Sequence, residues 1–355
     1  MTQEKQRLEV PEGLNEEYYQ INPDILASFS KYRPPLNIFK FKEEVARVTP
    51  YYQVGQRLSN EQIEELADLV KEGLIFVSRE DHPVYVKHIS YQLDLVLVDK
   101  NLKESEVADI FVQALTMRLT DFLDQPVQAV FGKLQEDVMV LTQYLWQDIH
   151  KIRGLTRRLH REHSLSNHSF NSGIMGLALY AHMNDKAFAA GEIKRRTLDR
   201  LAIGMFIHDL GMTKIPIFIR KKDKPLTGDE RTKMLQHPKL GYQMLSKLDL
   251  KFPEVEQCVL EHHERVDGKG YPQHSEMKDM GKYGRLCAVA DAFSAMTAKR
   301  PYAPLKDPLT AAGELARDNG FDANATKALQ AMVVTQKHWK AMAEDILKEQ
   351  QQGKG

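Results

Sequence analysis

From Ser166 almost to the C-terminus, apolar residues recur at the three- and four-residue spacing of α-helices, and no strand of convincing length appears. Capping residues at Thr227, Pro253 and Asp307 open separate helices, and the first of these is expected to end at Pro238. The pattern predicts that residues 166–345 form an all-α domain and that the protein as a whole is mainly α.

Two adjacent histidines extend the apolar face of one of these helices. In PEVEQCVLEHHE, positions 255, 258, 259, 262 and 263 form one stripe at helical spacing, so His262 and His263 continue its buried side. One buried histidine is usually a satisfied core residue, whereas two adjacent ones on an apolar stripe seldom are. Ten of the 13 histidines fall between His150 and His274, and imidazole is the commonest ligand of transition metals. The stripe indicates a metal site rather than scattered surface histidine.

Two acidic residues lie in equally apolar surroundings. Asp209 follows His208 at the end of the helical segment LDRLAIGMFI, and Asp291 lies within LCAVADAFSAM. An ionised carboxylate that is buried without a partner costs several kcal/mol, so a bound cation, an arginine or a helix-capping role must compensate Asp209. His237 is a further candidate. Imidazoles and carboxylates without cysteine suit iron, manganese or zinc in a dinuclear arrangement better than a structural zinc site.

The length of 355 residues suggests two domains, at about 150 residues per domain. Residues 1–35 contain four prolines and little periodicity, which predicts an irregular arm. A small α+β domain is expected over 36–128, with strands at 74–77 and 84–86 and a helix from about Glu104 to Leu123. No catalytic constellation occurs in this half, which favours a regulatory or docking domain.

A long linker helix is predicted over 129–165. Its apolar residues between Leu134 and Leu159 recur at steps of three or four, which is typical of a coiled-coil seam. The seam either pairs with a second chain, giving a homodimer through 134–159, or packs on its own domain. At the other end of the chain, residues 346–355 are expected to be a disordered tail.

Charge and cysteine content limit the class of protein. Basic and acidic residues number 49 each, whereas proteins that bind nucleic-acid backbone carry a basic excess, so DNA or RNA binding is not expected. The two cysteines, Cys258 and Cys287, fit a reducing compartment. The polar start argues against a signal peptide, and the longest apolar runs are too short to span a bilayer. We expect a cytoplasmic protein without membrane insertion.

Five short motifs follow one another in the helical half. They are HDLG at 208–211, HP at 237–238, HHERVDGKGYP at 262–272, VAD at 289–291 and RPY at 300–302. Together they resemble the HD-GYP domain, a branch of the HD metal-dependent phosphohydrolases whose members hydrolyse the bacterial second messenger cyclic di-GMP. The resemblance runs from about Ser166 to Lys340, roughly half of the chain.

This resemblance implies two divalent metal ions, iron or manganese, held by a defined set of residues. The implied ligands are His168, His208, Asp209, His237, His262, His263 and Asp291. Asp209 would bridge the two ions, and His208 and Asp209 would form the catalytic pair. Two cations about 3.5–4 Å apart lower the pKa of a bridging water and neutralise charge on the phosphate, so a metal-bridging hydroxide is the expected nucleophile.

Four further residues are candidate substrate contacts. Arg300 matches the arginine that contacts the substrate phosphate in this family, which suits the fixed fork of a guanidinium. Tyr271 is expected to stack on guanine or to reach a phosphate, and a packed loop anchor is the alternative interpretation. Lys269, in the same loop, and Lys214 complete the set.

The sequence departs from the family at three positions. Members with three metals carry a glutamate four residues before the first histidine, and that position is Ser164 here. Glu162 and His163 are expected on other faces of a continuous helix, so a dinuclear site is favoured. The usual lysine after HDLG is Met212, and the basic residue after RPY is Ala303, which predicts weaker phosphate binding.

The expected activity is hydrolysis of cyclic di-GMP to linear pGpG, the product that the resemblance associates with two-metal members, and further cleavage to GMP is left open. The main alternative is a nucleotide-binding effector or sensor with little turnover that uses the same metal site. Another cyclic dinucleotide or a nucleotide monophosphate is a third substrate option. A protein partner is expected at the N-terminal domain or at the GYP loop.

Overall fold

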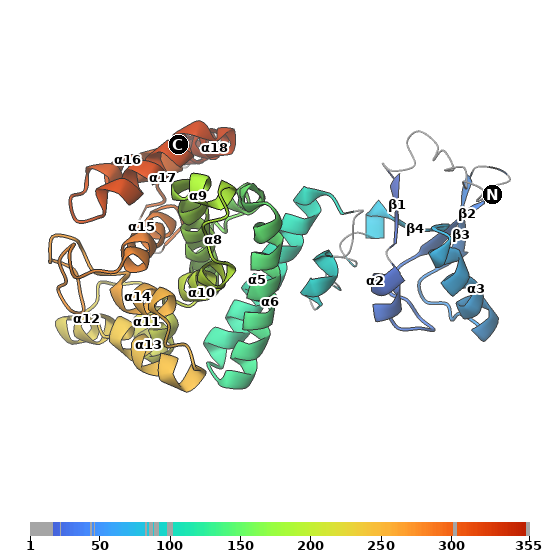
Figure 1. The fold of residues 1–355 in the computed structure, drawn as a ribbon, viewed down its shortest axis with the longest axis horizontal. Helices are drawn as coiled ribbons and strands as arrows, with labels where there is room; N and C mark the ends of the chain where they lie inside the picture. Colours follow the sequence, from blue (N-terminus) through green and yellow to red (C-terminus); the bar gives the residue numbers. More distant parts are fainter. Residues whose placement is uncertain are drawn as a thin grey trace. The chain divides into compact units, whose positions relative to one another are not determined.

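The computed structural model describes residues 17–21, 23–42, 45, 47–81, 84, 88, 92–97, 102–300 and 304–352. The chain divides into two compact units, Met1–Gln113 and Ala114–Gly355 (Figure 1). The regular elements are mainly helices, and the N-terminal unit holds a small antiparallel sheet. The predicted fold class is therefore confirmed.

The N-terminal unit is built on a four-stranded antiparallel sheet. Its strands are β1 (Tyr18–Gln20), β2 (Ile38–Lys42), β3 (Arg47–Tyr52) and β4 (Ile75–Ser78), in the order β1-β4-β2-β3. Phe76 of β4 pairs with Gln20 on one side and with Phe39 on the other. Pro50 lies in β3, which is an edge strand, and an edge tolerates the missing N–H of proline.

Helix α3 (Asn60–Lys71) contacts β4 and α2 (Pro23–Ser28) in this unit. Its start is fixed by a capping box, in which the Ser59 side chain accepts from the Gln62 N–H and the Gln62 side chain accepts from the Ser59 N–H. Two short 3-10 helices, Arg79–Asp81 and Leu93–Leu97, follow the sheet.

Two predictions for this half are confirmed and one is wrong. The strand expected at 74–77 is β4, and the helix expected from Glu104 is α5 (Glu104–Asp124). The irregular arm expected over 1–35 is wrong where the structure describes it, because β1 and α2 lie there. A three-residue strand such as β1 is stabilised by pairing with β4, a distant segment, and local periodicity does not reveal it. Positions 85 and 86 of the other predicted strand lie outside the described residues.

The regular elements of the C-terminal unit after α5 are all helices. They are α6 (Gln128–Gln147), η4 (Ile149–Lys151), α7 (Ile152–Thr156), α8 (Leu165–Met183), α9 (Asp185–Ala189), α10 (Arg195–Phe206), η5 (Leu210–Lys214), α11 (Ile217–Arg220), α12 (Gly228–Met234), α13 (His237–Leu245), η6 (Ser246–Leu248), α14 (Pro253–Glu261), α15 (Lys282–Met296), α16 (Pro308–Arg317), α17 (Ala323–Thr335) and α18 (Lys337–Gln352). The predicted all-α character of this half is confirmed.

The core of this unit lies around α8. This helix packs along α15 on one side and along α10 on another, and α14 packs in turn against α10 and α15 (Figure 1). Phe170 of α8, Phe206 of α10 and Phe293 of α15 are completely buried. All candidate ligands except His237 lie on these helices or at their ends, so the apolar core fixes their positions.

Two glycines bring α13 unusually close to η5. A Cβ atom on Gly211 would overlap the backbone carbonyl of His237, and one on Gly241 would lie 3.0 Å from the Gly211 nitrogen. A larger residue at either position would separate the two elements. The close approach holds the first residue of α13, His237, beside Asp209, which immediately precedes η5.

The predicted continuous linker helix is wrong, because the seam is divided over α6, η4 and α7. Asp148 has an extended backbone (φ −158°, ψ 107°) and its side chain caps η4 by accepting from the His150 N–H. The seam residues Leu134, Val138, Leu141, Leu145, Ile149, Ile152 and Leu155 are all buried within their own chain.

The seam thus packs on its own unit. Thr142 of α6 donates a hydrogen bond of 2.6 Å to Asp199 of α10, which also receives one of 2.7 Å from Arg195. These contacts tie α6 to the helix that ends before His208. Of the two interpretations of the seam, the structure supports packing within the chain, and a homodimer through 134–159 stays a prediction.

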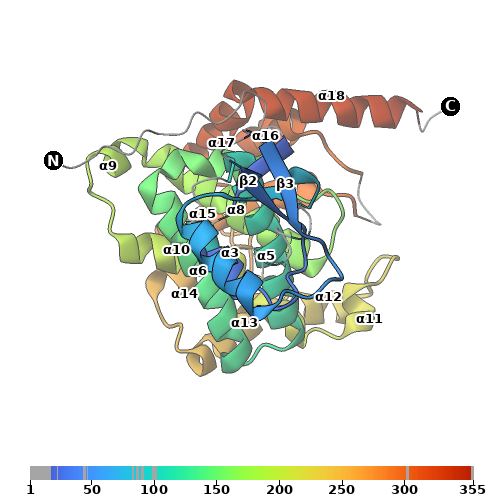
Figure 2. The same cartoon turned by 90° about the vertical axis from the view of Figure 1, so that its right-hand side faces the viewer.

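Two other helix boundaries differ from the prediction. Pro238 does not end the helix opened at Thr227, because that helix stops at Met234 and Pro238 lies in the first turn of α13. The tail expected to be disordered from 346 is helical as far as Gln352, as part of α18. Helix α18 lies beside α16 and α17 (Figure 2). Trp339, Ala343 and Ile346 form its buried face.

Candidate metal centre

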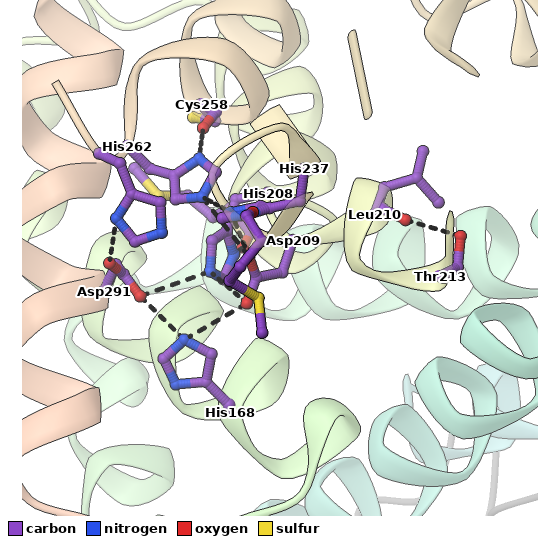
Figure 3. A network of polar contacts seen from close by, with 12 residues as sticks. His168, His208, Asp209, Leu210, Thr213, His237, Cys258, His262 and Asp291 are labelled. Atoms are coloured by element: carbon purple, nitrogen blue, oxygen red, sulfur yellow. Dashed lines mark hydrogen bonds and ion pairs between the residues drawn. The ribbon is translucent and has the colours of Figure 1, made fainter. Parts of the chain in front are cut away.

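Helices from separate parts of the chain bring the predicted ligands to one place (Figure 3). His168 comes from the first turn of α8, His208 and Asp209 from the turn after α10, His237 from the start of α13, His262 and His263 from the turn after α14, and Asp291 from α15. All except His263 are more than nine-tenths buried.

Backbone carbonyls fix the orientation of three imidazoles. The Nδ1 atoms of His208, His237 and His262 lie 2.9, 2.8 and 3.0 Å from the carbonyl oxygens of Met205, Met234 and Cys258. A carbonyl oxygen can only accept a hydrogen bond, so Nδ1 carries the proton in each ring. In the neutral form of each ring the lone pair then lies on Nε2, which points into the centre, as in histidines that ligate metals.

Asp209 lies between two groups of imidazoles. Its Oδ1 is 3.2 Å from His237 Nε2 and 3.5 Å from His262 Nε2. Its Oδ2 is 3.7 Å from His168 Nε2 and 3.8 Å from His208 Nε2. Each oxygen of one carboxylate thus faces a different pair of rings, which is the geometry of a bridging ligand.

Asp291 closes the opposite side of the centre. Its Oδ1 is 2.8 Å from His168 Nε2 and 3.7 Å from His208 Nε2, and its Oδ2 is 3.7 Å from His263 Nδ1. The two carboxylates therefore contact all five imidazoles between them.

Burial and opposite charge compete in setting the pKa values of these groups. Burial opposes protonation of His208, but the carboxylates of Asp209 and Asp291 raise its pKa to about 10. Burial favours the neutral acid for both aspartates, yet the surrounding imidazoles hold the pKa of each well below its usual range. Burial and the neighbouring histidines lower the pKa of His262 and of His263. The centre therefore combines anionic oxygens with neutral imidazoles at His262 and His263, which are the forms that ligate metals, whereas the raised pKa of His208 favours its protonated form.

The donor set fits divalent cations. The Nε2 atoms of His237 and His262 are only 3.1 Å apart although both bear lone pairs, an arrangement that a cation between them stabilises. The buried atoms His208 Nε2 and His168 Nδ1 have no hydrogen-bond partner among the described residues. Two sets of ligand atoms lie within 4.8 Å of one another, namely Asp209 with His237, His262 and His263, and Asp209 with His168 and His208.

Tyr271 lies at the edge of the centre. Its ring stacks on His263 with centroids 4.7 Å apart and an interplanar angle of 26°. Burial, followed by the charges of Asp291 and Asp209, raises the pKa of Tyr271 above its usual range, so the phenol keeps its proton. Its contact with a candidate ligand fits both a substrate-facing role and the loop-anchor interpretation.

Glu264 holds the loop that carries Tyr271, and the sequence did not reveal this role. The carboxylate is completely buried and accepts hydrogen bonds from the backbone N–H groups of Gln273, at 2.5 Å, and Ser275, at 3.0 Å. A Cβ atom on Gly270 would overlap the backbone of Glu264 and Arg265, so the loop folds tightly over this residue. The sequence feature that could have indicated this role is the position of an acidic residue within a glycine-rich motif.

The three predicted cationic contacts differ in position. The Nε atom of Arg300 is buried and has no hydrogen-bond partner among the described residues. Lys269 is exposed and forms an ion pair of 3.0 Å with Asp267. Lys214 is exposed at the end of η5, and no polar contact joins it to the centre among the described residues. Of the three, only Arg300 has an unsatisfied buried donor.

His163 lies beside the centre, which corrects its expected place on another face of a continuous helix. Helix α8 begins at Leu165 with Ser164 as its N-cap, so the chain turns before His163 is reached. The His163 and His168 rings have centroids 5.8 Å apart. Reduced contact with water, and then the charge of Arg300, lower the pKa of His163 to about 4.

The chain is similar in sequence to several known proteins. Residues 178–325 match the family described as HD domain. The cyclic di-GMP phosphodiesterase response regulator RpfG of Xanthomonas campestris is 40% identical over 97 residues, which are 27% of this chain and 26% of that protein. The 3'3'-cGAMP-specific phosphodiesterase 2 of Vibrio cholerae is 36% identical over 105 residues, which are 29% of this chain and 20% of that protein. The chain thus spans about a quarter of the length of these curated relatives.

A solved structure supports the fold. Bd1817, a HDG"Y"P protein from Bdellovibrio bacteriovorus, superposes with a TM-score of 0.57 at 15% identity and covers 89% of this chain and 99% of its own. The agreement concerns the fold alone. Within the described residues, no helix combines the length and the apolar character needed to cross a membrane.

Proposed function

We propose that this chain, which matches the HD domain family over residues 178–325 and is similar to cyclic di-GMP phosphodiesterases, is a metal-dependent phosphodiesterase of the HD-GYP type that hydrolyses cyclic di-GMP. The observation that carries the proposal is the position of Asp209, whose two oxygens face separate pairs of imidazoles. One carboxylate shared by two donor sets suits two cations, and two cations suit the hydrolysis of a phosphodiester.

The proposed cofactors are two divalent cations, iron or manganese, held by the seven ligands named above. When bound, they would supply Lewis acidity toward the phosphate and lower the pKa of a water between them. The choice of metals rests on the donor chemistry, because imidazoles and carboxylates without thiolate suit these ions.

The protein's own residues would orient the substrate around this centre. Arg300 offers a buried donor without a partner, which suits a phosphate oxygen. Tyr271 presents a protonated phenol and an aromatic face beside His263, which suits a guanine ring or a phosphate. Asp209 and Asp291 orient the imidazoles through the contacts described above, so that little of the centre has to reorganise during the reaction.

We further propose that the product is linear pGpG. A third cation would need a ligand at Ser164, but the Ser164 hydroxyl accepts a hydrogen bond of 3.0 Å from the Asn167 N–H as the N-cap of α8. This supports a two-metal site, and the resemblance associates two-metal members with that product.

The test is to purify the full chain anaerobically, measure iron and manganese per chain, and follow cyclic di-GMP and pGpG by chromatography. The expected result is about two ions per chain and accumulation of pGpG. The double variant His208→Ala, Asp209→Ala should lose turnover. His182→Ala, on an exposed position of α8, is the matched control and should keep it. Equal rates for all three proteins would overturn the proposal.

A nucleotide-binding effector is the second candidate, because two lysines that would assist phosphate binding are engaged or distant. Lys269 pairs with Asp267, and Lys214 is exposed at the end of η5. Metal-loaded protein that binds cyclic di-GMP and leaves it intact over many hours would favour this candidate. Cleavage of 3'3'-cGAMP in preference to cyclic di-GMP would instead assign a different substrate to the same centre.

A further inference from the structure

His163 and Arg300 are brought side by side by backbone pairing between two distant segments. Glu162 and Lys299 form an isolated parallel bridge, and the Lys299 N–H donates a hydrogen bond of 2.8 Å to the Arg161 carbonyl. His163 and Arg300 are the next residues along each segment. Since paired parallel segments run in register, their next residues are neighbours too. The electrostatic interaction between His163 and Arg300 agrees with this placement.

The segment that carries His163 is held firmly. The Asn167 side chain donates to the Glu162 carbonyl at 2.9 Å, and the Glu162 carboxylate forms an ion pair of 3.1 Å with Lys299. On the other side of His163, Ser164 caps α8. The position of His163 therefore depends on α8, which supplies His168, and on the segment that follows α15, the helix that supplies Asp291.

Both side chains keep donors free for a ligand. Arg300 Nε is buried without a hydrogen-bond partner, and no hydrogen bond or ion pair of His163 occurs among the described residues. His163 is exposed, yet its ring lies against that of His168. At one edge of the candidate metal centre, the pair thus combines an accessible imidazole with a guanidinium whose buried Nε has no hydrogen-bond partner among the described residues.

We propose that His163 and Arg300 form an anion-binding edge that holds a non-bridging phosphate oxygen of the substrate. The proposal rests on the proposed function, in which that anion is a phosphodiester. It assigns a role to His163, for which the resemblance offers none. His163 also supplies a hydrogen-bond donor in a chain that lacks two basic residues usual in the family. Met212 and Ala303 stand at those two positions here.

A hydrogen-bonding role fits His163 better than a role as an eighth metal ligand. Neither set of ligand atoms that lie within 4.8 Å of one another among the described residues includes His163. A guanidinium beside an imidazole repels a cation and attracts an anion. The expected consequence is that loss of His163 weakens phosphate binding and leaves the metal content unchanged.

The experiment compares the wild-type protein with His163→Ala, Arg300→Ala, their double variant and the control His182→Ala. Metal per chain is measured first, and then the affinity of the metal-loaded proteins for inorganic phosphate by calorimetry. His163→Ala should weaken phosphate binding about tenfold, the usual effect of one hydrogen bond to a charged group. The fold-loss of phosphate affinity in the double variant should be smaller than the product of the fold-losses in the two single variants, because both residues bind the same anion.

With cyclic di-GMP as substrate, His163→Ala should raise KM and change kcat little, and His163→Gln should restore part of the affinity. Phosphate affinity equal to that of the wild-type protein would overturn the proposal. A loss of metal in His163→Ala would also overturn it, because it would assign the imidazole to a cation. If phosphate binding depends on His163 while cyclic di-GMP stays uncut by the wild-type protein, the anion-binding edge stands and the phosphodiesterase proposal fails.

Discussion

At the scale of single residues, Asp209 combines deep burial with contacts on both of its carboxylate oxygens. It is more than nine-tenths buried, it precedes η5, and its two oxygens face different pairs of imidazoles. A replacement that keeps the shape but removes the charge should therefore affect both proposed cations at once. A replacement of a histidine in one donor set should affect one of them.

Asp209→Asn should accordingly reduce the metal content from about two ions per chain to well below one, and lower turnover by about a hundredfold or more. His237→Gln should remove about one ion. Metal analysis of the purified variants measures both effects. Asp185→Asn, on an exposed carboxylate, is the control and should keep its metal. Full metal occupancy in Asp209→Asn would contradict the bridging role.

Glu264 is a positioning residue rather than a ligand. In Glu264→Gln one acceptor oxygen becomes an NH₂ donor that faces a backbone N–H, so we expect a loss of about 1–3 kcal/mol of unfolding free energy and a higher KM. Denaturant unfolding and steady-state kinetics measure the two effects. Glu276→Gln changes an exposed side chain of the same loop region and should leave both unchanged. An unaltered stability of Glu264→Gln would show that the loop does not depend on this carboxylate.

Part of the candidate centre was predictable from the residues themselves, because some polar groups interrupt an apolar helical stripe, whereas His168 was named only through the family resemblance. His262 and Asp291 stand in stripes that are otherwise buried, and that contradiction identifies them without any structure. His163 was missed because the sequence pattern extends α8 backward past its true start. Helix periodicity does not reveal that the Ser164 hydroxyl, by accepting a hydrogen bond from the Asn167 N–H, fixes the start of α8 at Leu165.

At the scale of elements, the contact between η5 and α13 decides whether two parts of the centre meet. Gly211 and Gly241 allow these elements to touch, and the contact places His237 against Asp209. Replacement of either glycine should therefore reduce metal binding, although neither glycine has a side chain that could act as a ligand.

Gly211→Ala should place a methyl group into the backbone of His237, lower stability by about 1–3 kcal/mol and reduce metal binding. Thermal unfolding and metal analysis measure these effects. Gly313→Ala in α16 is the matched control, since a Cβ there meets nothing within 4 Å. That change should stabilise α16 by up to about 1 kcal/mol. A Gly211→Ala protein with normal metal content would show that the close approach is not needed.

The elements that sequence reasoning missed are those that depend on distant partners. β1 is only three residues long and is stabilised by its pairing with β4. β3 contains a proline, a residue that usually argues against a strand in the sequence. The break at Asp148 was missed because the apolar spacing continues through it. Periodicity reports which side of the chain is buried, but an extended residue between two helices can preserve that spacing.

At the scale of the whole molecule, the division between the two units, at Gln113, falls inside α5. Leu115, Leu119 and Phe122 of α5 are completely buried, and Phe122 packs on Phe131 of α6 with ring centroids 5.5 Å apart. Arg118 of α5 also forms an ion pair of 2.8 Å with Asp137 of α6. The helical half therefore needs α5 in order to cover α6.

A fragment of residues 104–355 should fold and bind metal, whereas a fragment of residues 129–355 should aggregate, because it exposes the apolar face of α6. Light scattering and circular dichroism compare the two fragments. A monomeric, fully helical 129–355 fragment would contradict this dependence. The regulatory or docking role of the N-terminal half stays a prediction, and the activity of the 104–355 fragment relative to the full chain is its direct test.

Two contacting ligands of the candidate centre lie far apart in the sequence. His168 and Asp291 meet at 2.8 Å although 123 positions separate them in the sequence. Ions bound there would fasten together the two ends of a long loop, as a disulfide does, and so restrict the freedom of the unfolded chain. Both cysteines of this protein are free, so the bound cations would act as reversible cross-links in place of disulfides.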